Sequence, residues 1–105
     1  MAQVPDRIIK ILKRYVAELE KNNIHLKAAI LFGSYATGNY RELSDIDIAL
    51  VSDDFEGVRF FDKEKIKKPT LAIDHRIEPL PFRTEDFSED NVFVKEILKT
   101  GVRVI

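Results

Sequence analysis

GSYATGNYRELSDIDIALV, residues 33–51, decides the fold, because it begins where one apolar segment stops and ends inside another. The preceding segment, LKAAILF at residues 26–32, is too short for a helix and is typical of a buried strand that Gly33 closes. IDIALV, residues 46–51, predicts a second strand. A long polar connection therefore joins the two strands, and we expect the functional residues there.

The next segment predicts a helix followed by a third strand. Residues 58–66 are compatible with one modest helix, which Pro69 and the two lysines before it end. TLAIDHRIE, residues 70–78, has the β-branched content and partial alternation of a strand, ended by Pro79 and Pro81. We consider this strand as an antiparallel partner of the second one.

Helices are also predicted near both ends of the chain. Pro5 suits a first helical turn, and apolar residues then recur at helical spacing until about residue 22. Asp90 or Asn91 caps a last helix that Gly101 ends, and the tail VRVI adds an edge strand. These elements predict the α/β (α+β) class, with a small mixed β-sheet flanked by helices.

The composition limits the partners. The 105 residues, 45% hydrophobic and 33% charged, fit a single globular domain, residues 1–105. A net charge of -1 argues against nucleic acid as the main partner. The absence of cysteine, of a signal-peptide pattern in MAQVPDRII and of a membrane-spanning apolar run predicts a soluble, cytoplasmic protein. Because so small a domain has little room for a second lobe, we expect a partner protein, or a homo-oligomer.

Gly33 and Ser34, at the end of the first strand, are candidates for holding phosphate. A glycine lets the backbone turn sharply and approach a ligand, while backbone N–H groups and a hydroxyl at a helix start bind phosphate oxygens. A Gly-Ser pair after a strand is more often an ordinary turn, so this signal needs support from other residues.

Asp45 and Asp47 form a pair of carboxylates at the start of the second strand. Alternate strand residues point to the same face, so the two carboxylates project together and repel each other. A hard cation such as magnesium relieves that repulsion. The alternative is that the two residues only cap and solvate the end of the strand.

Asp74 is the candidate for a third carboxylate, because a charge inside the apolar run LAIDHRI needs a partner. In an antiparallel pairing, Asp74 comes level with Asp47. Glu78 shares the strand face of Asp74 by parity and is a second candidate. We expect His75 and Arg76 to be ordinary exposed residues of this strand.

Gly33-Ser34, ten intervening residues and Asp45-x-Asp47 resemble the GS-x10-DxD signature of DNA polymerase beta-like nucleotidyltransferases. Ala36 and Gly38 extend the match to the GSxAxG of that family, and a serine stands directly before the carboxylate pair, as in relatives. The small size is similar to that of the minimal nucleotidyltransferases, which are often the antitoxins of helical HEPN proteins.

The resemblance implies a nucleotidyltransferase fold and activity. Gly33 and Ser34 would contact the β- and γ-phosphates of a nucleoside triphosphate, expected to be ATP, and Asp45, Asp47 and Asp74 would be the catalytic and metal-binding residues for two Mg²⁺ ions. The residue after Ala36, often basic in relatives, is a threonine here, so this phosphate contact passes to Arg41 or is absent.

Three functions fit this chain. The first is transfer of a nucleoside monophosphate to an acceptor hydroxyl, which the resemblance extends to a tyrosine of a HEPN toxin. The second is a catalytically weak antitoxin that neutralises its helical partner by complex formation. The third is a plain divalent-metal-binding domain, which predicts metal affinity that does not depend on nucleotide.

Overall fold

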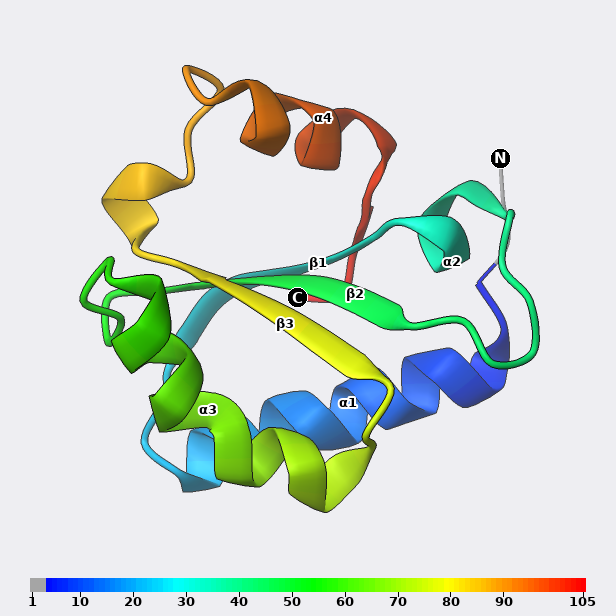
Figure 1. The fold of residues 1–105 in the computed structure, drawn as a ribbon, viewed down its shortest axis with the longest axis horizontal. Helices are drawn as coiled ribbons and strands as arrows, with labels where there is room; N and C mark the ends of the chain where they lie inside the picture. The colour runs from blue at the N-terminus through cyan, green and yellow to red at the C-terminus, as the bar shows by residue number, and fades with distance from the viewer. Residues whose placement is uncertain (1–3) are drawn as a thin grey trace.

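The computed structural model describes residues 4–105, and a four-stranded mixed sheet lies at its centre (Figure 1). In chain order the strands are β1 (Leu26–Phe32), β2 (Ile46–Ser52), β3 (Ile77–Phe82) and β4 (Val102–Arg103). The order across the sheet is β3-β2-β1-β4. Strand β1 runs antiparallel to β2 and β4, whereas β2 and β3 run parallel. The two apolar segments that flank the polar connection thus become the two inner strands.

Helices cover both faces of the sheet (Figure 1). They are α1 (Asp6–Lys21), α2 (Ser34–Thr37), α3 (Arg59–Ile73), the 3-10 helix η1 (Thr84–Asp86) and α4 (Val92–Thr100). On one face, α1 and α3 share a core with Ile48 and Leu50 of β2. On the other, α4 buries Val94 and Ile97 against Ala49. Even-numbered β2 side chains therefore face α1 and α3, and odd-numbered ones face α4. Within residues 4–105, no helix is both long and apolar enough to cross a membrane.

The elements predicted for the first half of the chain and for its C-terminus are confirmed. Helix α1 and strands β1 and β2 occupy the predicted segments. Asn91 caps α4, accepting hydrogen bonds from the backbone N–H groups of Phe93 and Val94, and Gly101 follows the last helical residue. The tail forms the short edge strand β4. The predicted α/β (α+β) class with a mixed sheet is therefore confirmed.

The predicted end of the middle helix is wrong, because α3 continues through Pro69 to Ile73. Thr70 Oγ1 donates to the carbonyl of Ile66 at 2.6 Å and forms a hydrogen bond of 2.6 Å with Tyr15 Oη of α1. These buried contacts stabilise the last turns of α3, which compensates for a proline inside a helix, a cost of about 3 kcal/mol.

The prediction for the third strand is also wrong in position and direction. Residues 70–73 belong to α3, and β3 begins at Ile77 and runs parallel to β2. Parallel neighbours need a crossover connection, usually a helix, and α3 supplies it. Asp74 lies at the C-terminal cap of α3, so it is not level with Asp47; the residue paired with Asp47 is Glu78.

Strand β3 is an edge of the sheet and contains two prolines. The backbone N–H of Ile46 donates to the carbonyl of Arg76 at 2.8 Å. The N–H and C=O groups of even-numbered residues of β3 therefore point to β2, and those of odd-numbered residues point away from the sheet. Pro79 and Pro81 occupy odd positions, where an N–H would face outward. The edge therefore lacks two of the donors that another strand would need for pairing.

Candidate functional site

Gly33 makes the turn between β1 and α2 that shapes the site. Its φ of 74° and ψ of -150° lie in a region that only glycine adopts readily. A side chain on Gly33 would also overlap the carboxylate of Asp47 on the neighbouring strand. Glycine is therefore required twice at this position, for its backbone conformation and for the approach to β2.

Helix α2 starts directly after this turn, with Ser34 as its first residue. The first N–H groups of a helix have no partner inside the helix and are available to an anion. The carbonyl of Gly33 accepts hydrogen bonds of 3.1 Å from the backbone N–H groups of Ala36 and Thr37, which fixes the turn to the helix. Gly33 thus lies beside the carboxylate of Asp47, and Ser34 follows it as the first residue of α2.

The connection from α2 to β2 is held by its own side chains. Tyr35 is fully buried and stacks on Tyr40, with ring centroids 4.6 Å apart. Ser44 Oγ accepts a hydrogen bond of 2.7 Å from the backbone N–H of Arg41, and the Ser44 N–H donates to the Arg41 carbonyl at 3.1 Å. These contacts fix the chain just before Asp45.

Asp47 and Glu78 lie side by side on neighbouring strands, and Asp45 precedes β2; we call these three residues the carboxylate row. Asp47 pairs with Phe32 on β1 and with Glu78 on β3, and partners in register share a face, here the face covered by α4. Asp45 is exposed directly before β2. Burial raises the pKa of Asp47, and the negative charges of Asp45 and Glu78 raise it further. The ionised form of Asp47 is therefore disfavoured, first by burial and then by the neighbouring negative charges.

This donor set fits a divalent cation. Carboxylate oxygens are the ligands that Mg²⁺ prefers, and a cation would offset the repulsion that raises the pKa of Asp47. Within residues 4–105, no three His, Cys, Asp or Glu side chains converge closely enough to enclose a metal ion. The carboxylates are thus neighbouring donors beside the turn at Gly33, an arrangement that suits a metal that is also coordinated by its substrate.

The model of the family described as "Polymerase beta, Nucleotidyltransferase" matches residues 7–105. The chain belongs to this nucleotidyltransferase family. A relative of Methanocaldococcus jannaschii named "Putative protein adenylyltransferase MJ0141" is 32% identical over 101 residues, which cover 92% of this chain and 95% of that protein. A second M. jannaschii relative, "Putative protein adenylyltransferase MJ0604", is 51% identical over 51 residues. The matched segment covers 47% of this chain and 51% of that relative, so this chain spans about half the length of MJ0604.

Solved structures share the fold of this nucleotidyltransferase. A Sulfolobus solfataricus protein described as a "putative nucleotidyltransferase" has a TM-score of 0.67 at 24% identity, covering 92% of this chain and 78% of that one. A toxin-antitoxin crystallised with AMP-PNP has a TM-score of 0.64 at 23% identity, covering 89% of this chain and 71% of that one. At these identities the likeness establishes the fold alone.

Asp74 lies apart from the carboxylate row of the nucleotidyltransferase. Its Oδ1 accepts from the backbone N–H of Arg76 at 2.8 Å, and its Oδ2 accepts from the Arg76 guanidinium at 3.1 Å. These hydrogen bonds lower the pKa of Asp74, because they favour its charged form. Arg76 also reaches the Glu42 carbonyl at 3.5 Å, so it joins the end of α3 to the loop before Asp45.

Arg76 was expected to be an ordinary exposed strand residue, and the structure corrects this. Its side chain is 21% exposed and is committed to Asp74. The signal in the sequence was the charge of Asp74 in an apolar run, which requires a partner of opposite charge nearby.

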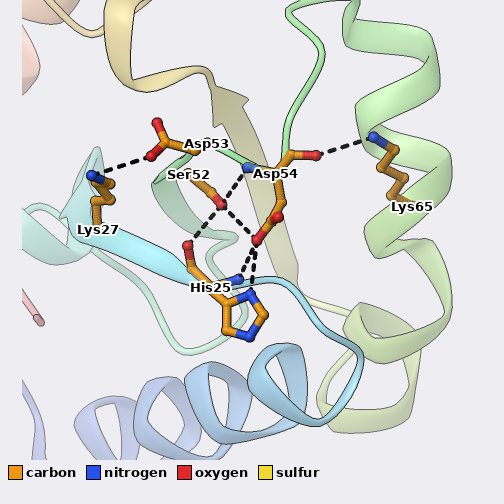
Figure 2. Close-up of polar contacts among 6 residues, drawn as sticks. All are labelled: His25, Lys27, Ser52, Asp53, Asp54 and Lys65. Carbon is orange, nitrogen blue, oxygen red and sulfur yellow. Dashed lines mark hydrogen bonds and ion pairs between the residues drawn. The ribbon is translucent and has the colours of Figure 1, made fainter.

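A second group of polar residues lies at the opposite end of β2 (Figure 2). Asp54 Oδ2 lies 2.8 Å from the His25 backbone nitrogen and 3.1 Å from His25 Nδ1. Ser52 Oγ donates to the His25 carbonyl at 2.7 Å, and Lys27 Nζ lies 3.2 Å from Asp53 Oδ2. The hydrogen bond from the His25 backbone lowers the pKa of Asp54. This group joins the start of β1 to the end of β2, with Asp53 paired to the ammonium of Lys27 and Asp54 held by hydrogen bonds.

Proposed function

We propose that this nucleotidyltransferase transfers AMP from ATP to a hydroxyl group of a protein. The observation that carries the proposal is the position of the Asp47 carboxylate, which lies against the glycine turn at Gly33 and in register with Glu78 on the next strand. Neighbouring carboxylates beside a glycine turn at a helix start suit metal-assisted phosphoryl transfer. The name of the M. jannaschii relative that matches over nearly its whole length supports a protein as the acceptor.

The proposed roles follow the positions of the side chains. Gly33 and Ser34 hold the β- and γ-phosphates through backbone N–H groups and the serine hydroxyl. Asp45 and Asp47 hold two Mg²⁺ ions, which when bound neutralise the triphosphate and favour ionisation of the acceptor hydroxyl. The acceptor oxygen forms a bond to the α-phosphorus while the bond to the pyrophosphate oxygen breaks.

We assign the third carboxylate to Glu78 in place of Asp74. Glu78 lies level with Asp47, whereas Asp74 is bound to Arg76. Glu78 would take the proton of the acceptor hydroxyl or complete the metal shell. Glu78→Gln should lower the rate of AMP transfer by about 100-fold or more, the usual contribution of a positioned acid or base.

Asp74→Asn is the matched control for this assignment. We expect transfer near the wild-type rate and a lower midpoint of thermal unfolding, because the variant weakens the contact with Arg76. Transfer from α-labelled ATP and circular dichroism measure the two quantities. Loss of transfer in Asp74→Asn, with Glu78→Gln active, would return the third role to Asp74.

The proposed acceptor is a tyrosine of a helical HEPN-type partner. A solved neighbour of the same fold is a toxin-antitoxin crystallised with AMP-PNP, which supports a protein partner and a nucleotide together.

The second candidate function is neutralisation of the partner by binding alone, favoured by the same toxin-antitoxin neighbour. The double variant Asp45→Asn, Asp47→Asn separates the two. If it still neutralises the toxin, binding suffices; if it forms the complex without neutralising, transfer is required.

The first test is calorimetric titration with α,β-methylene-ATP, in which the bond that must break is blocked, with and without magnesium. We expect magnesium-dependent binding that is lost in the Asp45→Asn, Asp47→Asn variant and kept in Asp53→Asn, which changes an aspartate at the far end of β2. A wild-type protein that binds magnesium equally with and without nucleotide would instead indicate a plain metal-binding domain.

A further inference from the structure

Two phenylalanines extend the carboxylate row toward α4. Phe32 is the last residue of β1, immediately before Gly33, and pairs with Asp47 across the sheet. Phe93, in the first turn of α4, meets Phe32 edge to face, with ring centroids 5.8 Å apart and an interplanar angle of 87°. Phe93, Phe32, Asp47 and Glu78 therefore follow one another along one face of the sheet.

The position of Phe93 is fixed although its ring is open to solvent. Asn91 Oδ1 accepts from the Phe93 backbone N–H at 2.9 Å, and the next residue, Val94, is fully buried against the sheet. The Phe93 side chain is 49% exposed. By contrast, Phe82, in the other aromatic pair of this layer, is 7% exposed. The ring of Phe93 is therefore held at a fixed place next to Phe32 with about half of its surface open to a ligand.

We propose that Phe93, supported by Phe32, is the stacking surface for the nucleobase of the bound nucleoside triphosphate. This inference rests on the proposed function. Attack at the α-phosphorus is in line, so the acceptor and the leaving pyrophosphate lie on opposite sides of it. Gly33 and Ser34, at the end of β1, hold the pyrophosphate, so the acceptor enters from the β3 side, where Glu78 stands.

The acceptor oxygen, the α-phosphorus and the leaving pyrophosphate oxygen define one axis, and the sugar and base are attached to the α-phosphate at an angle to that axis. They extend either away from the protein or over the face of the sheet that α4 covers. On that face, the exposed ring next to the row is Phe93, and it lies on the β1 side, away from the proposed acceptor entrance. Every nucleobase has an apolar planar face, so this contact supplies affinity with little selectivity among bases.

Phe93→Leu tests the proposal, because leucine keeps an apolar contact with Phe32 and removes the ring. Calorimetry compares the Kd of α,β-methylene-ATP with that of tripolyphosphate, both with magnesium. We expect the Kd for the nucleotide to rise about 5- to 150-fold, the range for one base stacked on an aromatic side chain, and the Kd for tripolyphosphate to stay unchanged. Phe60→Leu is the control, since Phe60 is 68% exposed on α3 and belongs to the other layer.

Phe93→Trp provides a second readout that does not depend on the stability of the leucine variant. The chain contains no tryptophan, so the new indole would be the sole one. Its fluorescence should change on addition of α,β-methylene-ATP and stay constant with tripolyphosphate.

The possible results separate this proposal from the one on which it rests. An unchanged nucleotide Kd in Phe93→Leu overturns the nucleobase assignment. If Phe93→Leu leaves the nucleotide Kd unchanged but raises the KM for the acceptor protein, the nucleobase assignment is wrong and Phe93 contacts the acceptor instead. If wild type binds tripolyphosphate as tightly as the nucleotide, only the stacking inference fails. If wild type binds neither compound, the proposed function fails as well.

Discussion

At the start of β2, Asp47 lies in register with Glu78 and Asp45 precedes the strand, and no ion pair to either aspartate occurs within residues 4–105. At the other end of the same strand, Asp53 and Asp54 are paired with Lys27 and His25. The pKa of Asp47 is raised, whereas the pKa of Asp54 is lowered. The two aspartate pairs at the ends of β2 therefore differ in whether the protein itself supplies hydrogen-bonding or ion-pair partners for them, and the pair without such partners among the described residues is the one suited to hold a ligand.

Asp47→Asn and Asp54→Asn should separate the two ends most sharply. We expect the first change to lower AMP transfer by at least about 100-fold, because the charge that positions the metal is removed. The second change should leave transfer near the wild-type rate. Transfer from α-labelled ATP to the partner protein measures both, and equal losses would contradict a functional difference between the two ends.

The same variants should change stability in opposite directions. At pH 7 and without metal, Asp47→Asn should raise the free energy of unfolding, because it relieves the repulsion around Asp47. Asp54→Asn should lower it, because the hydrogen bonds from His25 weaken. Urea denaturation measures this, and a destabilised Asp47→Asn variant would show that the row is not strained by its charge.

Gly33→Ala and Gly57→Ala compare two glycines with positive φ, 74° and 86°. A side chain at Gly33 would meet the carboxylate of Asp47, whereas one at Gly57 would meet the flexible end of Arg83. We expect both variants to lose about 1–3 kcal/mol of stability from backbone strain. AMP transfer should be abolished in Gly33→Ala and kept in Gly57→Ala, as the labelled-ATP assay can establish.

The pH dependence of stability should show the smallest effect. The pKa of Asp47 is raised above its ordinary value of 3.8, so its stabilising contribution is complete below that value and is lost as pH rises through the folded pKa. The pKa of Asp54 is lowered, so its contribution is present above 3.8 and is lost as pH falls through the folded pKa.

Urea denaturation from pH 3 to pH 7 tests these signs. The gain in stability from Asp47→Asn should shrink as pH falls toward 4, whereas the loss from Asp54→Asn should shrink only below that pH. The experiment is done without divalent metal, because a cation bound at the row would lower the pKa of Asp47. A gain from Asp47→Asn that is constant over the whole range would contradict the raised pKa.

The sequence predicts the first half of the fold because its signals are local. Strands β1 and β2 are short apolar runs, and Gly33 and Asp47 come together once those two strands pair in an antiparallel hairpin. The third strand has no comparable local signal. Pro69 usually ends a helix, and its place inside α3 depends on the contact between Tyr15 and Thr70, which lie 55 residues apart.

The same long-range contact explains why the third carboxylate could not be assigned from the sequence. The register of β3 depends on where α3 ends, and that end decides whether Asp74 or Glu78 lies beside Asp47. Parity along the chain kept Glu78 as an alternative, and only the parallel pairing with β2 places it level with Asp47. The roles of Asp45, Asp47, Gly33 and Ser34 remain predictions that the variants above test.

The two prolines of β3 have a consequence for association. Proteins with an open strand edge can exchange segments while they are still folding, and such pairs separate only by unfolding. Pro79 and Pro81 remove the outward donors that exchange along this edge would use. A protein that bound along this edge would therefore contact an already folded surface through side chains and not by adding a strand.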